Sequence, residues 1–186
     1  MNTKKESPSS ARQGKSLESA TKVTKKQPYR KPEAVKLLEL LVFTEKRIKY
    51  PNIPIDYMAP VTFRDDSANG LTKCVIDYIK LKHGYAERIN TTGRPIDNTK
   101  AFTDVIGRQR SIGSITWIPG TGTNGSSDVA ATINGLSVKI EIKVKRDIQS
   151  EAQKKYQHDV EAAGGLYYIA HDFTSFLTWY NLNFAQ

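Results

Sequence analysis

The side chains that could form a catalytic site lie in one short stretch, between Asp128 and Lys143. Residues 136–144 alternate apolar and polar side chains, which is the pattern of a strand with one face against a core. Glu141 and Lys143 are two residues apart, so their side chains point to the same face of that strand. Asn134-Gly135 is a strong signal for a two-residue hairpin turn. Counting back from this turn places Asp128 directly across from Glu141.

Two carboxylates that face each other across a hairpin repel unless a cation lies between them. Hard oxygen ligands without Cys or His favour Mg²⁺ or Mn²⁺. Such a metal can generate a hydroxide nucleophile and polarise a phosphodiester, and Lys143 beside it can stabilise charge on the phosphate or help to deprotonate water. The alternative is a solvated strand face with alternating charges, because Glu-x-Lys is a common pattern. The residues alone leave both interpretations open.

Hydrophobic periodicity predicts the helices and strands that hold these residues in place. Apolar residues at helical spacing predict helices at 32–49, 69–82, 150–163 and about 173–182. Strands are predicted at 85–90, 115–118, 128–133, 136–144 and 166–170. Residues 97–110 fit either a short helix or a long loop. The order of elements predicts an α/β fold, with a mixed four-stranded sheet flanked by helices.

Composition divides the chain into three parts. Residues 1–31 are polar and basic with few apolar anchors, so we expect a disordered basic tail that holds a polyanion loosely. Residues 32–67 form an N-terminal helix and a Pro-containing connector, and residues 68–186 form the domain that carries the hairpin. The net charge is +9, but residues 1–35 contain nine Lys and Arg against three Asp and Glu. Most of the excess charge therefore belongs to the tail.

Several classes of protein are excluded by what the chain lacks. It has no apolar run of membrane-spanning length and no secretory signal, and its one cysteine, Cys74, permits no internal disulfide. We therefore expect a cytoplasmic protein without a membrane partner. The glycine spacing Gly120-x-Gly122-x-x-Gly125 fits a dinucleotide site, but a strand pattern follows it where a helix is needed. We expect no nucleotide cofactor.

Three segments together resemble a known superfamily: Gly125-Ser126-Ser127-Asp128, Ile140-Glu141-Ile142-Lys143 and Ser150-x-x-Gln153. They are similar to the PD-(D/E)XK nucleases, and more closely to the VRR-NUC branch with its small phage-type members. The resemblance covers about residues 68–180. It implies a restriction-endonuclease-like core and a Mg²⁺- or Mn²⁺-dependent endonuclease that hydrolyses phosphodiester bonds of DNA. The implied substrates are branched DNA such as junctions or flaps, and the implied process is phage DNA replication, recombination or repair.

The resemblance also implies a role for each matching residue. Asp128 and Glu141 would bind the metal through their carboxylates, with the Ile142 carbonyl as a further ligand. Lys143 would be the catalytic lysine. Gln153 matches a helix glutamine that lies near the site in the family, although an ordinary exposed helix residue is an equal alternative.

The chain also departs from the family pattern. Ser127 stands where the superfamily often has Pro, and Asn69 stands where many relatives place an acid in the first core helix. Asp65 and Asp66 lie just before that helix and could substitute, but helix capping explains them better. A second metal site is therefore left open.

Polar and basic side chains near the hairpin are candidates for contacts with DNA phosphates. They are Arg88, Arg94, Lys145, Arg146, Lys154 and Gln157, the last one helical turn beyond Gln153. Nothing in the sequence resembles a base-reading helix or finger, so we expect recognition by shape. Cutting both strands of a junction would require a homodimer. Two rivals remain: a non-catalytic nucleic-acid-binding module, and a packaged phage structural protein whose basic tail neutralises nucleic acid.

Overall fold

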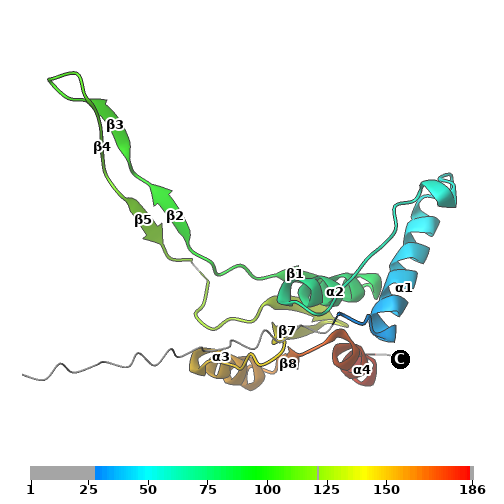
Figure 1. Ribbon diagram of the computed structural model, residues 1–186. Coiled ribbons are helices and arrows are strands. Elements are labelled where there is room, and N and C mark those ends of the chain that lie inside the picture. Colours follow the sequence, from blue (N-terminus) through cyan, green and yellow to red (C-terminus); the bar gives the residue numbers. More distant parts are fainter. Residues whose placement is uncertain (1–27, 121, 185–186) are drawn as a thin grey trace, which may run out of the picture.

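The computed structural model describes residues 28–120 and 122–184 (Figure 1). Most of the predicted tail, residues 1–27, lies outside this range. The last residues of the predicted tail make contacts with the body of the protein. The Tyr29 hydroxyl donates to Asp65 at 2.8 Å, and Lys31 forms an ion pair with Glu39. The packed part of the chain therefore includes these residues.

The core of the protein is one mixed sheet of four strands in the order β1-β6-β7-β8. The strands are β1 (Tyr85–Arg88), β6 (Val129–Ile133), β7 (Leu136–Ile142) and β8 (Leu166–Ala170). The β1–β6 and β6–β7 pairs are antiparallel, whereas β7 and β8 are parallel. The predicted α/β fold, a mixed four-stranded sheet flanked by helices, is confirmed.

Within the described residues, four α-helices surround this sheet: α1 (Glu33–Lys49), α2 (Ala68–Leu81), α3 (Glu151–Ala162) and α4 (Phe173–Phe184). A short 3-10 helix, η1 (Ile55–Tyr57), follows α1. Helix α2 packs on β1, β6 and β7, while α4 packs on α2 and β8, and α1 packs on both of these helices. Helix α3 connects β7 to β8 and lies against β8. None of the helices described here is both long and apolar enough to cross a membrane.

The two faces of the sheet differ in what they bury. Val138, Ile140 and Ile142 of β7 alternate along the strand and lie in the same hydrophobic core as α2 and α4. Burying each such side chain stabilises the fold by about 1.5–3 kcal/mol. On β8, Tyr168 stacks on Trp179 of α4, whereas the preceding Tyr167 meets Tyr156 of α3 edge to face. Helix α3 therefore covers the face of the sheet that carries the polar residues of β7.

Between β1 and β6 the chain leaves the core as an extended arm, residues 94–118 (Figure 1). It contains β2 (Arg94–Asp97), β3 (Lys100–Thr103), β4 (Gln109–Ile112) and β5 (Ile115–Ile118). Strand β2 pairs with β5 and β3 pairs with β4, both antiparallel. The prediction of a short helix or a long loop at residues 97–110 is wrong. The predicted strand at 115–118 exists as β5, but it belongs to the arm and not to the sheet.

The arm turns at residues 104–107, and local hydrogen bonds explain this turn. Gly107 has φ +80°, a conformation that glycine adopts without strain. The Asp104 carboxylate accepts hydrogen bonds from the backbone N–H groups of Ile106 and Arg108 at 3.0 and 2.9 Å. The signal was hard to read in the sequence because both faces of the ribbon are exposed, so no alternation against a core marks its strands.

Candidate active site

The hairpin of β6 and β7 has the register that the sequence predicts. Ile133 pairs with Leu136 and Val129 pairs with Ile140, on either side of a turn at Asn134-Gly135. Asn134 and Gly135 both have positive φ, 49° and 82°, as a type I′ turn requires. One step beyond Val129 and Ile140, the same register brings Asp128 across from Glu141.

Asp128 lies at the end of β6, and its backbone and side chain are both fixed by neighbouring strands. Its carbonyl oxygen accepts a hydrogen bond from the Ile89 N–H at 2.8 Å, which extends the β1–β6 ladder. Its Oδ2 accepts a hydrogen bond from the Ile142 N–H at 2.9 Å. The carboxylate is therefore held against β7, beside the backbone of the residue that follows Glu141.

Glu141 is a buried carboxylate with only 2% of its surface exposed. Burial raises its pKa above the ordinary value, and the negative charge of Asp128 raises it further. Lys143 acts in the opposite direction, with its Nζ 3.3 Å from Glu141 Oε1. The predicted face is therefore not a solvated strand surface, because its central carboxylate lies beneath α3.

Lys143 is also buried, with 6% of its surface exposed. Its Nζ lies 3.3 Å from both Glu141 Oε1 and Asp147 Oδ2. Its backbone N–H donates to Ala170 of β8 at 2.9 Å, and its carbonyl oxygen lies 2.8 Å from His171 Nδ1. The lysine thus stands at the end of β7 with its ammonium directed toward the carboxylate of Glu141.

Gln153 connects α3 to Glu141 and caps its own helix at the same time. The Ser150 hydroxyl accepts a hydrogen bond from the Gln153 N–H, and Gln153 Oε1 accepts one from the Ser150 N–H, which together form a capping box. The side-chain nitrogen Nε2 donates to Glu141 Oε1. Gln153 is therefore a site residue and not an ordinary exposed helix residue.

The loop before Asp128 lies directly on the first turn of α3. Gly125 has φ +77°, and a Cβ atom at this position would lie 2.4 Å from the backbone carbonyl of Ala152. A glycine is therefore required for this close approach. The next residue, Ser126, has a buried hydroxyl with no hydrogen-bond partner within the described part of the chain. The Gly125–Asp128 motif thus locks the Asp128 loop to the helix that carries Gln153.

A pocket of about 400 Å³ opens beside Asp128. Its other lining residues are Arg88, Ile89, Asn90, Thr91 and Thr92, which leave β1 toward the arm. Two further hollows, lined by residues of the 90–94 and 117–125 segments, continue from this pocket to the root of the arm. Asp128 is therefore accessible from the base of the arm, whereas buried Glu141 lines none of these hollows.

A hard divalent cation fits the donor set at the end of β7. Asp128 and Glu141 offer carboxylate oxygens, and the charge of Asp128 disfavours ionisation of buried Glu141, which a cation would reverse. Among the residues described, no group of three or more His, Cys, Asp or Glu side chains could hold a metal. The Ile142 carbonyl and water would therefore have to complete the coordination, as Mg²⁺ allows because it usually keeps several waters.

The basic residues that were predicted to contact DNA phosphates lie at different distances along the chain from the hairpin site, on β1, the arm, the turn after β7 and α3. Arg88 lines the Asp128 pocket, and Arg94 begins the arm. Lys145 and Arg146 are exposed in the turn after β7, where Lys145 has φ 62°. Strand β7 ends at Ile142, so the predicted extension of this strand to residue 144 is wrong. Lys154 forms an exposed ion pair with Glu151 on α3.

Gln157 is not brought to the carboxylates. Its Oε1 accepts a hydrogen bond from Gln149 at 3.0 Å, and its Nε2 donates to Glu161 at 2.8 Å. The groove contact expected of Gln157 therefore has no support in its hydrogen bonds.

The acids considered for a second metal have structural partners. Asp65 is buried, and it accepts hydrogen bonds from Tyr29 and from the backbone N–H of Phe173 at the start of α4. Asp66 forms an ion pair with Arg64 at 2.6 Å. The N-cap of α2 is Ser67, which accepts from the Gly70 N–H. Capping and charge pairing account for these residues, although Asp65 caps α4 and not the expected helix.

Sequence reasoning missed three residues around the hairpin: Tyr167, Asp147 and His171. The Tyr167 hydroxyl lies 3.5 Å from Glu141 Oε2, and burial together with the charge of Glu141 raises the pKa of this tyrosine. The parallel pairing of β7 with β8 brings Tyr167 there. Strand pairing was the available signal, since the strand after a crossover helix commonly lies beside the one before it.

Comparison with protein families and with curated proteins finds no match for this chain. The resemblance of the Gly125–Asp128 and Ile140–Lys143 segments to a nuclease family therefore rests on the sequence of these segments alone.

Proposed function

We propose that the protein is a Mg²⁺- or Mn²⁺-dependent endonuclease that hydrolyses phosphodiester bonds of DNA. The observation that carries this proposal is the pairing of Asp128 with buried Glu141, with Lys143 and Gln153 both contacting Glu141 Oε1. Glu141 is buried with its charge paired to Lys143, whereas Asp128 is only partly buried and lines an open pocket, and packing alone does not require such an arrangement.

The order of elements supports a restriction-endonuclease-like core of the PD-(D/E)XK type, close to VRR-NUC. An antiparallel hairpin carries the acids, a crossover helix follows, and the next strand is parallel to the second hairpin strand. Asp128 directly precedes β6, Glu141 lies in β7, Lys143 directly follows β7, and Gln153 lies in the first turn of α3. This placement matches the spacing on which the resemblance rests.

Each residue has a defined role in this proposal. Asp128, Glu141 and the Ile142 carbonyl would hold the cation, which when bound supplies an activated water and polarises the phosphate. Lys143 places a positive charge where negative charge develops on the phosphate oxygens. Gln153 is a positioning residue, since its hydrogen bond fixes the orientation of the Glu141 carboxylate.

The substrate is proposed to be branched or otherwise structured DNA in phage replication, recombination or repair, recognised by shape. A homodimer would place two such sites on the two strands of a junction. The host cytoplasm is the proposed compartment.

The test is a cleavage panel of linear, nicked, flapped and four-way DNA with Mg²⁺ or Mn²⁺. We expect the full chain to cut at least one of these substrates, and Asp128→Asn to abolish the cut while keeping the melting temperature within a few degrees. Glu151→Gln, an exposed acid of α3 that pairs with Lys154, is the matched control and should cut normally. Absence of cleavage by the wild-type chain on every substrate, or full activity of Asp128→Asn, would overturn the proposal.

A second candidate is a non-catalytic nucleic-acid-binding protein with the same fold. One observation favours it: Glu141 Oε1 already contacts Gln153 and Lys143, so this oxygen has partners without a metal. The same panel separates the two, because this candidate binds DNA and cuts none of the substrates.

A further inference from the structure

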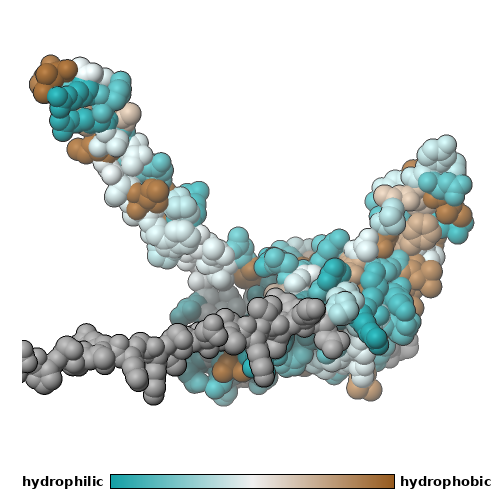
Figure 2. All heavy atoms as spheres, viewed as in Figure 1, coloured by the Kyte–Doolittle hydropathy of each residue, from teal (hydrophilic) through white to brown (hydrophobic). Residues whose placement is uncertain are grey.

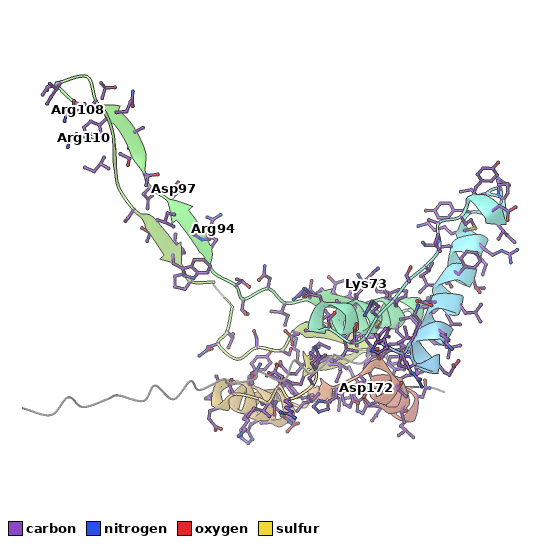
Figure 3. All side chains as sticks on the ribbon, in the orientation of Figure 1. Lys73, Arg94, Asp97, Arg108, Arg110 and Asp172 are labelled. Atoms are coloured by element: carbon purple, nitrogen blue, oxygen red, sulfur yellow. The ribbon has the colours of Figure 1, made fainter. Side chains whose placement is uncertain are left out.

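We infer that the arm, residues 94–118, is a duplex-DNA grip that lies in a groove with one face toward the phosphates. This inference rests on the proposed function only in naming DNA as the polyanion. It assigns a role to Lys100, Arg108 and Arg110, which lie in the segment that sequence reasoning left as a helix or loop. Figure 3 labels Arg108 and Arg110 near the end of the arm.

The β2–β5 and β3–β4 ladders are two separate two-stranded sheets that follow each other along the arm in the same register. Arg94 pairs with Ile118 and Asp97 with Ile115 in the first ladder, while Lys100 pairs with Ile112 in the second. Counting inward from either ladder matches residue 98 with 114 and residue 99 with 113, so no residue is inserted between them. The Asn98 N–H donates to the Ser114 carbonyl at 3.3 Å, which bridges the junction.

This register sorts the charges of the arm onto one face. Side chains alternate between the faces of a strand, and directly opposed residues share a face. In and beside the β3–β4 ladder all three cations occupy even-numbered positions, so Lys100, Arg108 and Arg110 share one face with Phe102 and Ile112. Arg94 occupies the corresponding even-numbered position in the β2–β5 ladder. The other face, which runs from Pro95 to Trp117, contains no Lys or Arg.

The cations on this face are largely free to bind a polyanion. Arg110 pairs with Asp104 at 2.8 Å and so supports the turn. The other three form no ion pair within the described residues, and all three are exposed. An exposed row of cations with a single acid beside it is complementary to a row of phosphates.

The apex of the arm carries aliphatic side chains where hairpin turns are usually polar. Val105 is fully exposed, with a relative exposure of 105%, and Ile106 is 70% exposed. Figure 2 shows this hydrophobic apex beside hydrophilic residues at the end of the arm. Asp104 fixes the turn that presents them, so their exposure is built into the loop. Aliphatic side chains at such a tip can contact base edges or wedge between base pairs.

The dimensions and the position of the arm fit a DNA groove. A two-stranded ribbon can enter the major groove, and eleven residues from Arg94 to Asp104 span about 33 Å, close to the roughly 34 Å of one helical turn. The arm starts at the hollows that continue from the Asp128 pocket. DNA that lies along the cationic face would therefore pass the candidate site at the root of the arm.

The decisive variant exchanges neighbouring residues, so that composition and net charge stay the same. Lys100→Ala with Ala101→Lys and Arg108→Gln with Gln109→Arg together move two cations to the opposite face. Binding of the full chain to a labelled duplex longer than two helical turns is measured in EDTA, over a series of KCl concentrations. We expect affinity to fall on the order of tenfold, and the slope of log K against log salt to decrease by about 2, since each lost phosphate contact removes roughly 0.9. Unchanged affinity and slope would overturn the inference.

A second variant tests the apex separately. Val105→Ser with Ile106→Ser should weaken binding several-fold and leave the salt slope unchanged, because no cation is lost. Unchanged affinity would overturn the contact between the apex and the bases. A second copy of the chain is the rival occupant of the arm. Sedimentation tests this rival. If the exchange variant is a monomer where the wild-type chain is a dimer, and the loss of this dimer accounts for the whole loss of DNA affinity, the arm is a subunit contact and the inference fails.

These outcomes are independent of cleavage. If the exchange variant loses binding while the wild-type chain cuts nothing, the grip stands and the proposed endonuclease fails. If the wild-type chain cuts DNA but the exchange variant binds DNA with unchanged affinity, the endonuclease stands and the grip fails.

Discussion

The hairpin site and the arm hold charged side chains in opposite environments. Glu141 and Lys143 are almost fully buried, and each is held by partners from β7 itself, α3 or the turn after β7. Lys100 and Arg108 project from an exposed ribbon whose strands pair with each other. Burying a charge without partners costs several kcal/mol, whereas an exposed charge costs almost nothing.

The two environments suit different functions. The hairpin site is preorganised, so a small change there should abolish chemistry or destabilise the fold. The arm contributes little to the core, so changes there should affect association with a partner and leave folding intact.

The largest expected effect concerns Lys143. Lys143→Gln removes the charge beside Glu141, and we expect the cleavage rate to fall on the order of 10²- to 10³-fold, as when one group that stabilises transition-state charge is lost. DNA affinity in EDTA should stay unchanged because Lys143 is buried. Lys139→Gln, on the same face of the same strand, is the control and should keep its activity. Equal rates for both variants would contradict the assigned role.

The next effect compares the same substitution in the two regions. Ile140 of β7 is 0% exposed and Ile112 of the arm is 66% exposed. Ile140→Ala should lower the free energy of unfolding by about 2–5 kcal/mol, because it leaves a cavity in the core. Ile112→Ala should change it by less than about 0.5 kcal/mol. Urea unfolding measures both, and a cost at Ile112 as large as that at Ile140 would break the comparison.

A smaller effect concerns binding of a cation. Mn²⁺ at ten times its dissociation constant should stabilise the wild-type chain by about 1.4 kcal/mol at neutral pH. Glu141→Gln should lose this stabilisation, whereas Glu151→Gln should keep it. Thermal unfolding with and without EDTA gives the measurement. Equal stabilisation of wild type and Glu141→Gln would place the cation elsewhere.

The pH dependence of stability follows from the raised pKa of Glu141. Burial and the charge of Asp128 raise this pKa above 4.5, so the folded state binds the proton more tightly than the unfolded state. The resulting stabilisation is complete below pH 4.5 and is lost as pH rises through the folded-state pKa. In EDTA, Glu141→Gln should therefore gain stability relative to wild type over that window. A difference that stays constant, or that falls as pH rises, would contradict the burial and charge assigned to Glu141.

The smallest effect separates the two roles of Gln153. Gln153→Glu keeps a residue that can complete the capping box with Ser150, so the cap should cost little stability. It also places a second carboxylate against Glu141, which should raise the pKa of Glu141 further and shift the pH–rate profile for cleavage to higher pH. A Gln153 that only capped α3 would leave this profile unchanged.

The sequence was most informative where a core imposes periodicity. Val138, Ile140 and Ile142 alternate because one face of β7 is buried, and Asn134-Gly135 fixes the register that brings Asp128 to Glu141. The position of Gln153 was also predictable, because the capping signal places it in the first turn of α3. The four-stranded sheet, its helices and the hairpin could therefore be predicted from the sequence.

The rest depended on pairings that the sequence does not reveal. The arm packs its strands on each other and buries no face, so residues 97–110 lack the alternation that marks a strand. Tyr167 reaches Glu141 only because β8 lies parallel to β7. Helical spacing predicted that Gln157 lines the groove beside Gln153, but its side chain forms hydrogen bonds with Gln149 and Glu161.

The most direct test of the central claim is the single-turnover cleavage rate of Glu141→Gln in Mn²⁺, on the substrate that the wild-type chain cuts best. The claim is that the Asp128–Glu141 pair holds the cation that drives hydrolysis. We predict that the rate falls at least about 10³-fold, while the affinity for the same DNA in EDTA matches that of the wild type. A Glu141→Gln variant that cuts this substrate at the wild-type rate would contradict the account.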